Sequence, residues 1–273
     1  MKGCNYISVV LPAYNAASTI KETLVSINEQ DYDKEFELVI VNDGSKDSTL
    51  EIIKTFHFND HIRLKIISRE NKGFIYSLTE AIDNSQGNII ARIDSDDVWN
   101  SNHLSLIAEY FIKQPNLVLI GSNAIVIDKE GHFIRKTKCF LEDKQLRKEL
   151  CHDNPFVHSS VLFKKDAYQK TCGYKCGKGY FFEQIADYNL WFELSKYGQI
   201  KNVPEYTLKY RFLQSSMSRN IDYTSNYLSR IYMEKKVWRY YKKNTLFFLK
   251  SLLLSYAKLS YLKLRHYALH ENR

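Results

Sequence analysis

Three aspartates stand together after an apolar run: Asp94, Asp96 and Asp97 follow "NIIARI" at residues 88–93. Carboxylates this close repel one another, so an opposite charge has to stabilise them. Carboxylate oxygens are the hard ligands that Mg²⁺ and Mn²⁺ prefer, and these cations commonly combine one or two carboxylates with phosphate oxygens. The cluster therefore predicts a divalent-cation site that holds a diphosphate, and the competing interpretation is a solvated acidic turn.

Other polar groups follow other apolar runs. Tyr14 and Asn15 come after "YISVVLPA", and Asp43 lies in "NDGS" after "FELVIV". Asp43 is either a ligand or a residue of a good turn sequence. The chain has no GxGxxG after its first apolar run and no GxxxxGK[ST] motif. The phosphates of a bound nucleotide would therefore need the cation rather than a glycine-rich loop.

The elements that position these groups alternate between strand and helix. Strands are predicted at 6–15, 36–43, 62–68, 88–94 and 116–127, and helices at 18–30, 50–56, 73–85, 102–113 and 183–198. Thr19 with Glu22 forms a capping-box pattern at the start of the first helix. The alternation indicates an α/β fold with a Rossmann-like, mostly parallel sheet and helices on both faces. Ligands of such sheets bind outside the carboxyl ends of the strands, where the three polar groups should meet.

Five segments, taken in order, resemble one family. "VVLPAYNAASTI", "LVIVNDGSKDSTLEII", "ENKGF", "GNIIARIDSDDVW" and "ADYNLW" are similar to the family 2 glycosyltransferases over roughly residues 7–215. The resemblance implies the GT-A fold and an inverting transferase (EC 2.4) that uses a nucleotide-diphosphate sugar. It also implies a Mn²⁺ or Mg²⁺ cofactor.

The resemblance also assigns residues. The nucleotide-sugar site would comprise Pro12, Tyr14, Asn15, Asp43, Lys72, Asp94, Ser95, Asp96 and Arg211. Asp43 would accept a hydrogen bond from the base, most often uracil, and Lys72 would lie near the base or phosphates. Asp94 should lie near the ribose. Asp96 should bind the metal, directly or through water, with Asp97 as the close alternative.

Two later residues complete the assignment. Asp187 matches the family's catalytic base, although Ala186 precedes it where Glu is common; the alternative is an acid that favours a helix start. The segment "YRFLQSSMS" resembles a loop of the family that folds over the diphosphate. Arg211 fits that pattern, but Leu213 stands where His is common. A surface salt bridge is the alternative for Arg211. His158 is expected to be structural or to contact the acceptor rather than to act as a second base.

The charge lies at one end of the chain. Residues 221–273 hold eleven Lys or Arg and three acidic residues, so they carry the whole formal charge of +8. Basic side chains interleaved with Tyr, Trp, Phe and Leu predict helices that contact an anionic membrane, or that pack on the protein. No signal peptide or spanning segment is evident, and the five scattered cysteines indicate reduced thiols. We therefore expect a cytoplasmic protein, peripheral on the cytoplasmic face of the inner membrane.

These features predict one catalytic domain and a tail. Residues 1–220 form the GT-A domain, with a nucleotide-sugar half at 1–122 and an acceptor half at 123–220, and 221–273 form the basic tail.

The QxxRW motif of processive synthases is absent, so one sugar is expected per encounter with a glycan or glycolipid acceptor, as in lipid-diphosphate-linked polysaccharide, O-antigen or capsule assembly. The alternatives are a phosphatase that forms a phospho-aspartate at Asp94 or Asp96, and a nucleotidyltransferase. A nucleic-acid partner is not expected.

Overall fold

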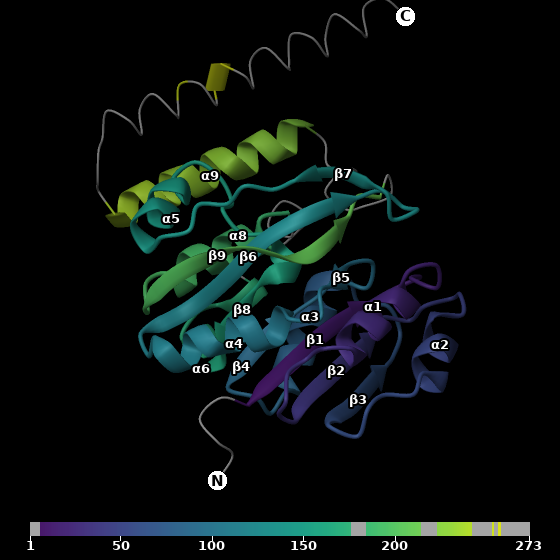
Figure 1. Cartoon of the computed structure of the whole chain (residues 1–273). Coiled ribbons are helices and arrows are strands. Elements are labelled where there is room, and N and C mark those ends of the chain that lie inside the picture. The colour runs from purple at the N-terminus through teal and green to yellow at the C-terminus, as the bar shows by residue number, and fades with distance from the viewer. Residues whose placement is uncertain (1–5, 176–183, 214–222, 242–252, 254–255, 258–273) are drawn as a thin grey trace, which may run out of the picture.

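One mixed sheet runs through the protein (Figure 1). The structure, a computed structural model, describes residues 6–175, 184–213, 223–241, 253 and 256–257. The strands are β1 (Ile7–Ala13), β2 (Phe36–Asn42), β3 (Ile62–Ser68), β4 (Ile89–Arg92), β5 (Val98–Trp99), β6 (Leu117–Ile127), β7 (Phe133–Lys136), β8 (Leu162–Lys164) and β9 (Gln199–Arg211). Their order is β3-β2-β1-β4-β8-β6-β9-β5, and β7 pairs with β6.

The first four strands in sequence are parallel neighbours, which confirms the predicted Rossmann-like half. The register places Ala13 of β1 beside Asn42 of β2, so both strands end at the same edge. β8 then runs antiparallel to both β4 and β6, while β6 and β9 are parallel. The sheet is thus mostly parallel but mixed, and it continues without a break from the first part of the chain into the second.

Helices pack on both faces of this sheet. They are α1 (Ile20–Asn28), α2 (Thr49–Thr55), α3 (Phe74–Asp83), α4 (His103–Lys113), α5 (Asp143–Glu149), α6 (Lys165–Gln169), α8 (Ala186–Leu194) and α9 (Tyr223–Tyr241), with 3₁₀ turns η1 (His158–Ser160) and η2 (Gly173–Lys175). Two successive residues of β1 point to opposite faces of the sheet. Val9 packs in one buried cluster with α1 and α4, and Val10 packs in another with α3 and α8. Apolar residues of β1 therefore support two layers, one on each face of the sheet.

Some predicted details differ from the structure. The capping box does not form, because the hydroxyl of Thr19 donates to the carbonyl of Ser95 (3.0 Å) and no side chain caps α1. The long strand β9 was not predicted, since Pro204 and the polar residues around it hide its pattern.

The structure also bears on the membrane, the cysteines and the basic tail. Within the described residues, no helix combines the length and apolarity that a bilayer crossing demands. Cys139 and Cys151 are free thiols, as expected, whereas Cys172 is disulfide-bonded, so the prediction of reduced thiols throughout was wrong for this residue. Most of the tail predicted at 221–273 lies outside the described residues, but α9 confirms that its first part is helical.

Candidate active site

Three polar loops meet at the carboxyl ends of β1, β2 and β4, as the strand pattern predicts. The backbone N–H of Asp43 donates to the carbonyl of Ala13 (2.8 Å), which joins the loops after β1 and β2. The hydrogen bond from Thr19 to the carbonyl of Ser95 (3.0 Å) joins the loop after β1 to the aspartate loop. One edge of the sheet therefore carries the residues that were separated in sequence.

The carboxylate of Asp43 is buried and already has partners in the protein. Arg69 forms an ion pair with it, and the backbone N–H groups of Lys72 and Gly73 donate to it (2.8 and 3.0 Å). A carboxylate has roughly four lone-pair sites, and these donors use three of them. Asp43 therefore orders the turn at 69–73, which a sequence reading of "NDGS" does not reveal.

The other predicted nucleotide contacts differ in exposure. Pro12 is buried inside β1, whereas Tyr14 and Asn15 are exposed at its end. Asn15 has a left-handed backbone with φ of 48°, a conformation that Asn tolerates better than most residues. Lys72 is exposed, and its ammonium lies 4.8 Å from the centre of the Tyr76 ring. Lys72 thus lies in the turn that Asp43 holds, with its ammonium beside the Tyr76 ring.

The aspartate cluster brings carboxylate oxygens of Asp94, Asp96 and Asp97 within 4.8 Å of one another. Burial, and then the charge of Asp94, raise the pKa of Asp96 to about 7. Burial and the two neighbouring carboxylates likewise raise the pKa of Asp97 well above its usual range. Asp97 is fully buried, and its Oδ2 has no hydrogen-bond partner among the described residues. The arrangement suits a cation, since orphaned and mutually repelling oxygens gain most from one.

A buried arginine supplies part of the opposing charge. Arg92 is fully buried in β4 and forms an ion pair with Asp94, and it donates to the hydroxyl of Ser159 (3.0 Å). The same hydroxyl accepts the backbone N–H of Asp94 (3.1 Å). The sequence analysis missed this residue. The available signal was a charged side chain inside the apolar run "NIIARI", because a buried charge requires a partner.

Arg211, predicted to contact phosphate, instead donates hydrogen bonds to the aspartate loop. It is buried at the end of β9, where its backbone N–H donates to Asp97 (2.7 Å) and its Nε donates to the carbonyl of Asp96 (2.9 Å). Its remaining nitrogens pair with Glu22 and donate to the carbonyl of Lys129 (2.9 Å). The guanidinium is therefore committed to protein groups. It does form a salt bridge with the exposed Glu22, as the alternative expected, but the arginine itself is buried.

Asp187 lies at the start of α8, partly exposed and within reach of the charge of Arg92. Its carboxylate accepts hydrogen bonds from the side chain of Asn154 and the backbone of Tyr188 (both 2.7 Å). Burial raises the pKa of Asp187, while the Tyr188 hydrogen bond and the charge of Arg92 oppose that shift. A carboxylate with a raised pKa is a better proton acceptor, as a general base must be.

His158 lies among aromatic side chains. Its Nε2 is 3.0 Å from the hydroxyl of Tyr174, and its ring packs edge-on against Trp191 and Phe74. Burial, with the charge of Arg92, lowers the pKa of His158 well below its usual range, so the imidazole is neutral. This setting agrees with the structural or acceptor-contacting role expected from the sequence.

Comparison with known proteins decides the class of this site. Residues 8–172, more than half of the chain, match the family described as glycosyl transferase family 2. The chain belongs to this family. The glycosyltransferase is 32% identical over 220 residues to the O-antigen biosynthesis glycosyltransferase WbnJ of Escherichia coli. This alignment covers 78% of the chain and 82% of WbnJ. It is 29% identical over 252 residues to an uncharacterized glycosyltransferase of Haemophilus influenzae, covering 89% of the chain and 76% of that protein.

Solved structures support the GT-A fold of the glycosyltransferase. S. aureus TarS 1–349, solved in complex with UDP-GlcNAc, superposes with a TM-score of 0.67 at 17% identity over 85% of this chain and 66% of that one. The mannosyltransferase PcManGT of Pyrobaculum calidifontis, solved with GDP-Man and Mn²⁺, gives 0.58 at 18% identity over 94% and 70%. Family membership makes the protein a glycosyltransferase that uses a nucleotide sugar, and it removes the phosphatase and nucleotidyltransferase alternatives.

Proposed function

We propose that this glycosyltransferase moves one sugar from a UDP-sugar to a hydroxyl of a lipid-diphosphate-linked glycan, with inversion, during surface-polysaccharide assembly. The observation that carries the proposal is the aspartate cluster at the carboxyl end of β4, where the oxygens of three carboxylates lie within 4.8 Å. The similarity to an O-antigen glycosyltransferase supports the type of acceptor. The TarS complex with UDP-GlcNAc supports uracil as the base.

The residues present fit a divalent cation. Asp96 and Asp97 would hold it, because Asp97 has an orphaned, fully buried Oδ2 and both carboxyl groups have raised pKa values that a cation would lower. Asp94 is engaged by Arg92 and lies partly exposed at the rim of the cluster, a place that suits contact with the ribose. When bound, Mn²⁺ or Mg²⁺ would neutralise charge on the departing diphosphate.

Asp187 takes the role of base in this proposal. Its carboxylate accepts the proton of the acceptor hydroxyl while that oxygen bonds to the anomeric carbon, and the bond from this carbon to the diphosphate breaks with its electron pair. A single displacement of this kind inverts the anomeric centre. Asn154 and the backbone of Tyr188 hold the carboxylate in place through the two 2.7 Å hydrogen bonds.

The nucleotide pocket would lie between the loops after β1 and β2. Asp43 has one acceptor position beyond the three donors described, and a uracil N–H would occupy it. Tyr14, Asn15 and Lys72 are exposed at the same edge and would contact the nucleotide. Arg211 supports this pocket indirectly, since its donors hold the carbonyl of Asp96 and the carboxylate of Glu22.

We retain the proposed division into a nucleotide-sugar half at 1–122, an acceptor half at 123–220 and a basic tail at 221–273. The tail would bring the enzyme to the cytoplasmic face of the inner membrane, where a lipid-linked acceptor is presented. The concentration of net positive charge in 221–273 and the helical character of α9 support this role.

The test is transfer of label from a panel of nucleotide sugars to a lipid extract of the source cells, with Mn²⁺ present. We expect one UDP-sugar to give a labelled, lipid-extractable product together with UDP. Label that appears only as free sugar phosphate, or no consumption of any nucleotide sugar, would contradict the proposal.

A further inference from the structure

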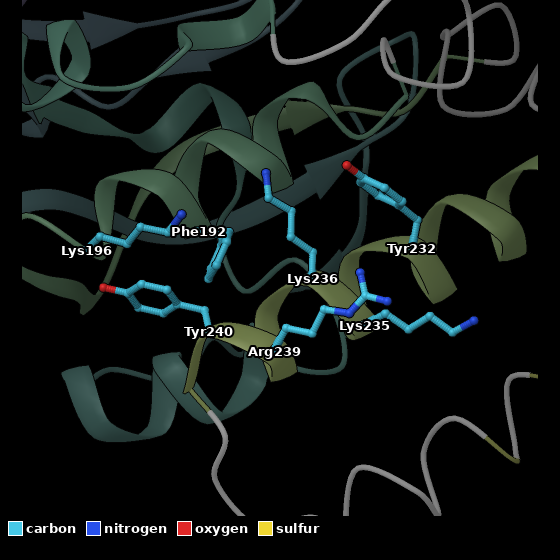
Figure 2. A pocket seen from close by; sticks show the side chains of 7 residues that line it. All are labelled: Phe192, Lys196, Tyr232, Lys235, Lys236, Arg239 and Tyr240. Atoms are coloured by element: carbon cyan, nitrogen blue, oxygen red, sulfur yellow. The ribbon is translucent and has the colours of Figure 1, made fainter.

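A basic and aromatic groove lies between α8 and α9, apart from the aspartate cluster (Figure 2). Its volume is about 570 Å³. Its lining consists of Phe192, Lys196, Tyr232, Lys235, Lys236, Arg239 and Tyr240. We call these seven residues the α8–α9 groove. It combines four cations with three aromatic rings, a composition that nothing in the proposed transfer reaction uses.

The α9 side of the groove is one face of a helix. Tyr232, Lys235, Lys236, Arg239 and Tyr240 follow the i, i+3, i+4, i+7, i+8 spacing that places side chains along one stripe. On the other face Ile231, Met233 and Val237 are buried, together with the acidic residue Glu234. The helix thus packs on the catalytic domain through this buried face, while its basic aromatic face borders α8, where Lys236 contacts Glu193 and Asn189.

The charges of the groove are only partly neutralised. Lys196 and Lys236 both pair with Glu193, at 2.7 and 2.8 Å. Lys235 donates to the hydroxyl of Tyr256 (2.8 Å), and Arg239 is exposed without an ion-pair partner among the described residues. Among the described residues, Glu193 pairs with two of the four cations and no carboxylate pairs with the other two, which leaves a site that favours an anion.

The rings provide an amphipathic rim around these charges. Figure 2 shows the Phe192 ring between the side chains of Lys196 and Lys236, whose ammonium groups lie 4.3 and 5.5 Å from the ring centre. Tyr240 is 52% exposed, and Leu253, close in sequence to Tyr256, is 68% exposed. Exposed tyrosine rings such as Tyr240 beside basic side chains are typical of segments that lie at the surface of a bilayer.

We propose that the α8–α9 groove binds the phosphate group of an anionic membrane lipid. The lipid-linked acceptor is the less suitable source of phosphate, because Phe192 lies on the opposite side of α8 from Asp187 at 100° per residue. A ligand in the groove would therefore point away from the proposed base. This inference refines the membrane contact included in the proposed function by naming the residues that make it.

The test is co-sedimentation of the full-length protein with phosphatidylcholine vesicles that do or do not contain phosphatidylglycerol. The groove variant is Lys235→Glu with Arg239→Glu, which leaves the Glu193 pairs intact. The matched control is Lys34→Glu with Lys54→Glu, two exposed positions whose reversal changes the net charge equally. Each basic residue near an anionic surface strengthens binding by roughly fivefold, so the groove variant should partition at least about 25-fold more weakly.

The control variant should bind the anionic vesicles as the unchanged protein does, and pure phosphatidylcholine should bind neither. Equal binding by the groove variant and the unchanged protein would overturn the proposal, as would an equal loss in the control. Thermal stabilisation by inorganic phosphate that the groove variant lacks, without any difference in vesicle binding, would assign the groove to a soluble phosphate and also overturn it. Because vesicle binding needs no sugar transfer, these outcomes are independent of the proposed function.

Discussion

The guanidinium of Arg92 pairs with the carboxylate of Asp94 from a fully buried position inside β4. Its charge also lowers the pKa values of Asp96 and Asp187 against the raising effect of burial on each. One cation therefore acts on the acids proposed to bind the donor and on the acid proposed to accept the proton. The clustered aspartates are stable in the fold partly because this arginine lies behind them.

Removing the charge of Arg92 should destabilise the fold. For Arg92→Met we expect a loss of about 2–4 kcal/mol in the free energy of unfolding, because Asp94 loses a buried partner while repulsion within the cluster increases. Urea denaturation measures the change. Arg63→Met is the control, since it breaks an exposed ion pair with Glu35 and should change little. Equal stability of the two variants would mean that Arg92 does not support the cluster.

Asp187→Asn should fold, bind UDP and lose about 10²–10⁴-fold in turnover, the usual contribution of a general base. Asp166→Asn is a matched control, because Asp166 also starts a helix and accepts the next backbone N–H at 2.7 Å, yet is exposed. If helix-start stabilisation were the only role of Asp187, the two variants would retain similar activity. Steady-state kinetics with the donor found by the nucleotide-sugar screen distinguishes these results.

The pH dependence of activity provides a separate check on Asp187. Its pKa is raised by burial, and only the ionised carboxylate can accept a proton. Activity should therefore fall as the pH decreases, at a pH above the ordinary aspartate value of about 4. The acid limb of the pH profile should disappear in Asp187→Asn, whose residual rate has no such base. An unchanged acid limb in the variant would assign it to another group.

Stabilisation by Mn²⁺ should increase with pH. The folded protein binds the proton of Asp96 more tightly than the unfolded chain does, with a pKa of about 7 against an ordinary value near 4. Without metal, this carboxyl group therefore lowers stability as pH rises through that interval. Mn²⁺ must displace the proton, so its effect on the melting temperature should be larger at pH 8 than at pH 5.5. Asp96→Asn should abolish the difference, and a pH-independent Mn²⁺ effect would argue against this site.

Arg211→Gln tests whether that residue is an anchor or a phosphate contact. As an anchor, its loss should cost about 2–4 kcal/mol of stability, because the carbonyl of Asp96 and the carboxylate of Glu22 lose their guanidinium donors. Arg135→Gln, at an exposed position of β7, is the control. Retained stability with weakened UDP binding would restore the phosphate contact predicted from "YRFLQ".

The sequence was most informative where function depends on strand ends. The apolar runs that become β1, β2 and β4 placed Asn15, Asp43 and Asp94 at a common edge, because parallel strands share a direction. The partners of those residues were not predictable, since Arg92 reaches Ser159 and Arg211 reaches Glu22 through the tertiary fold. β9 was missed for a local reason, as Pro204 lies within it and polar residues are spread along it.

The most direct measurement is calorimetric titration of UDP into the protein with and without Mn²⁺, repeated on an Asp96→Asn, Asp97→Asn double variant shown to be folded by circular dichroism. The account predicts binding by the unchanged protein that strengthens at least tenfold with Mn²⁺, and no Mn²⁺ effect in the variant. UDP affinity of the unchanged protein that is the same with or without the cation, or a Mn²⁺ effect that persists in the variant, would contradict the assignment of the aspartate cluster as the donor site.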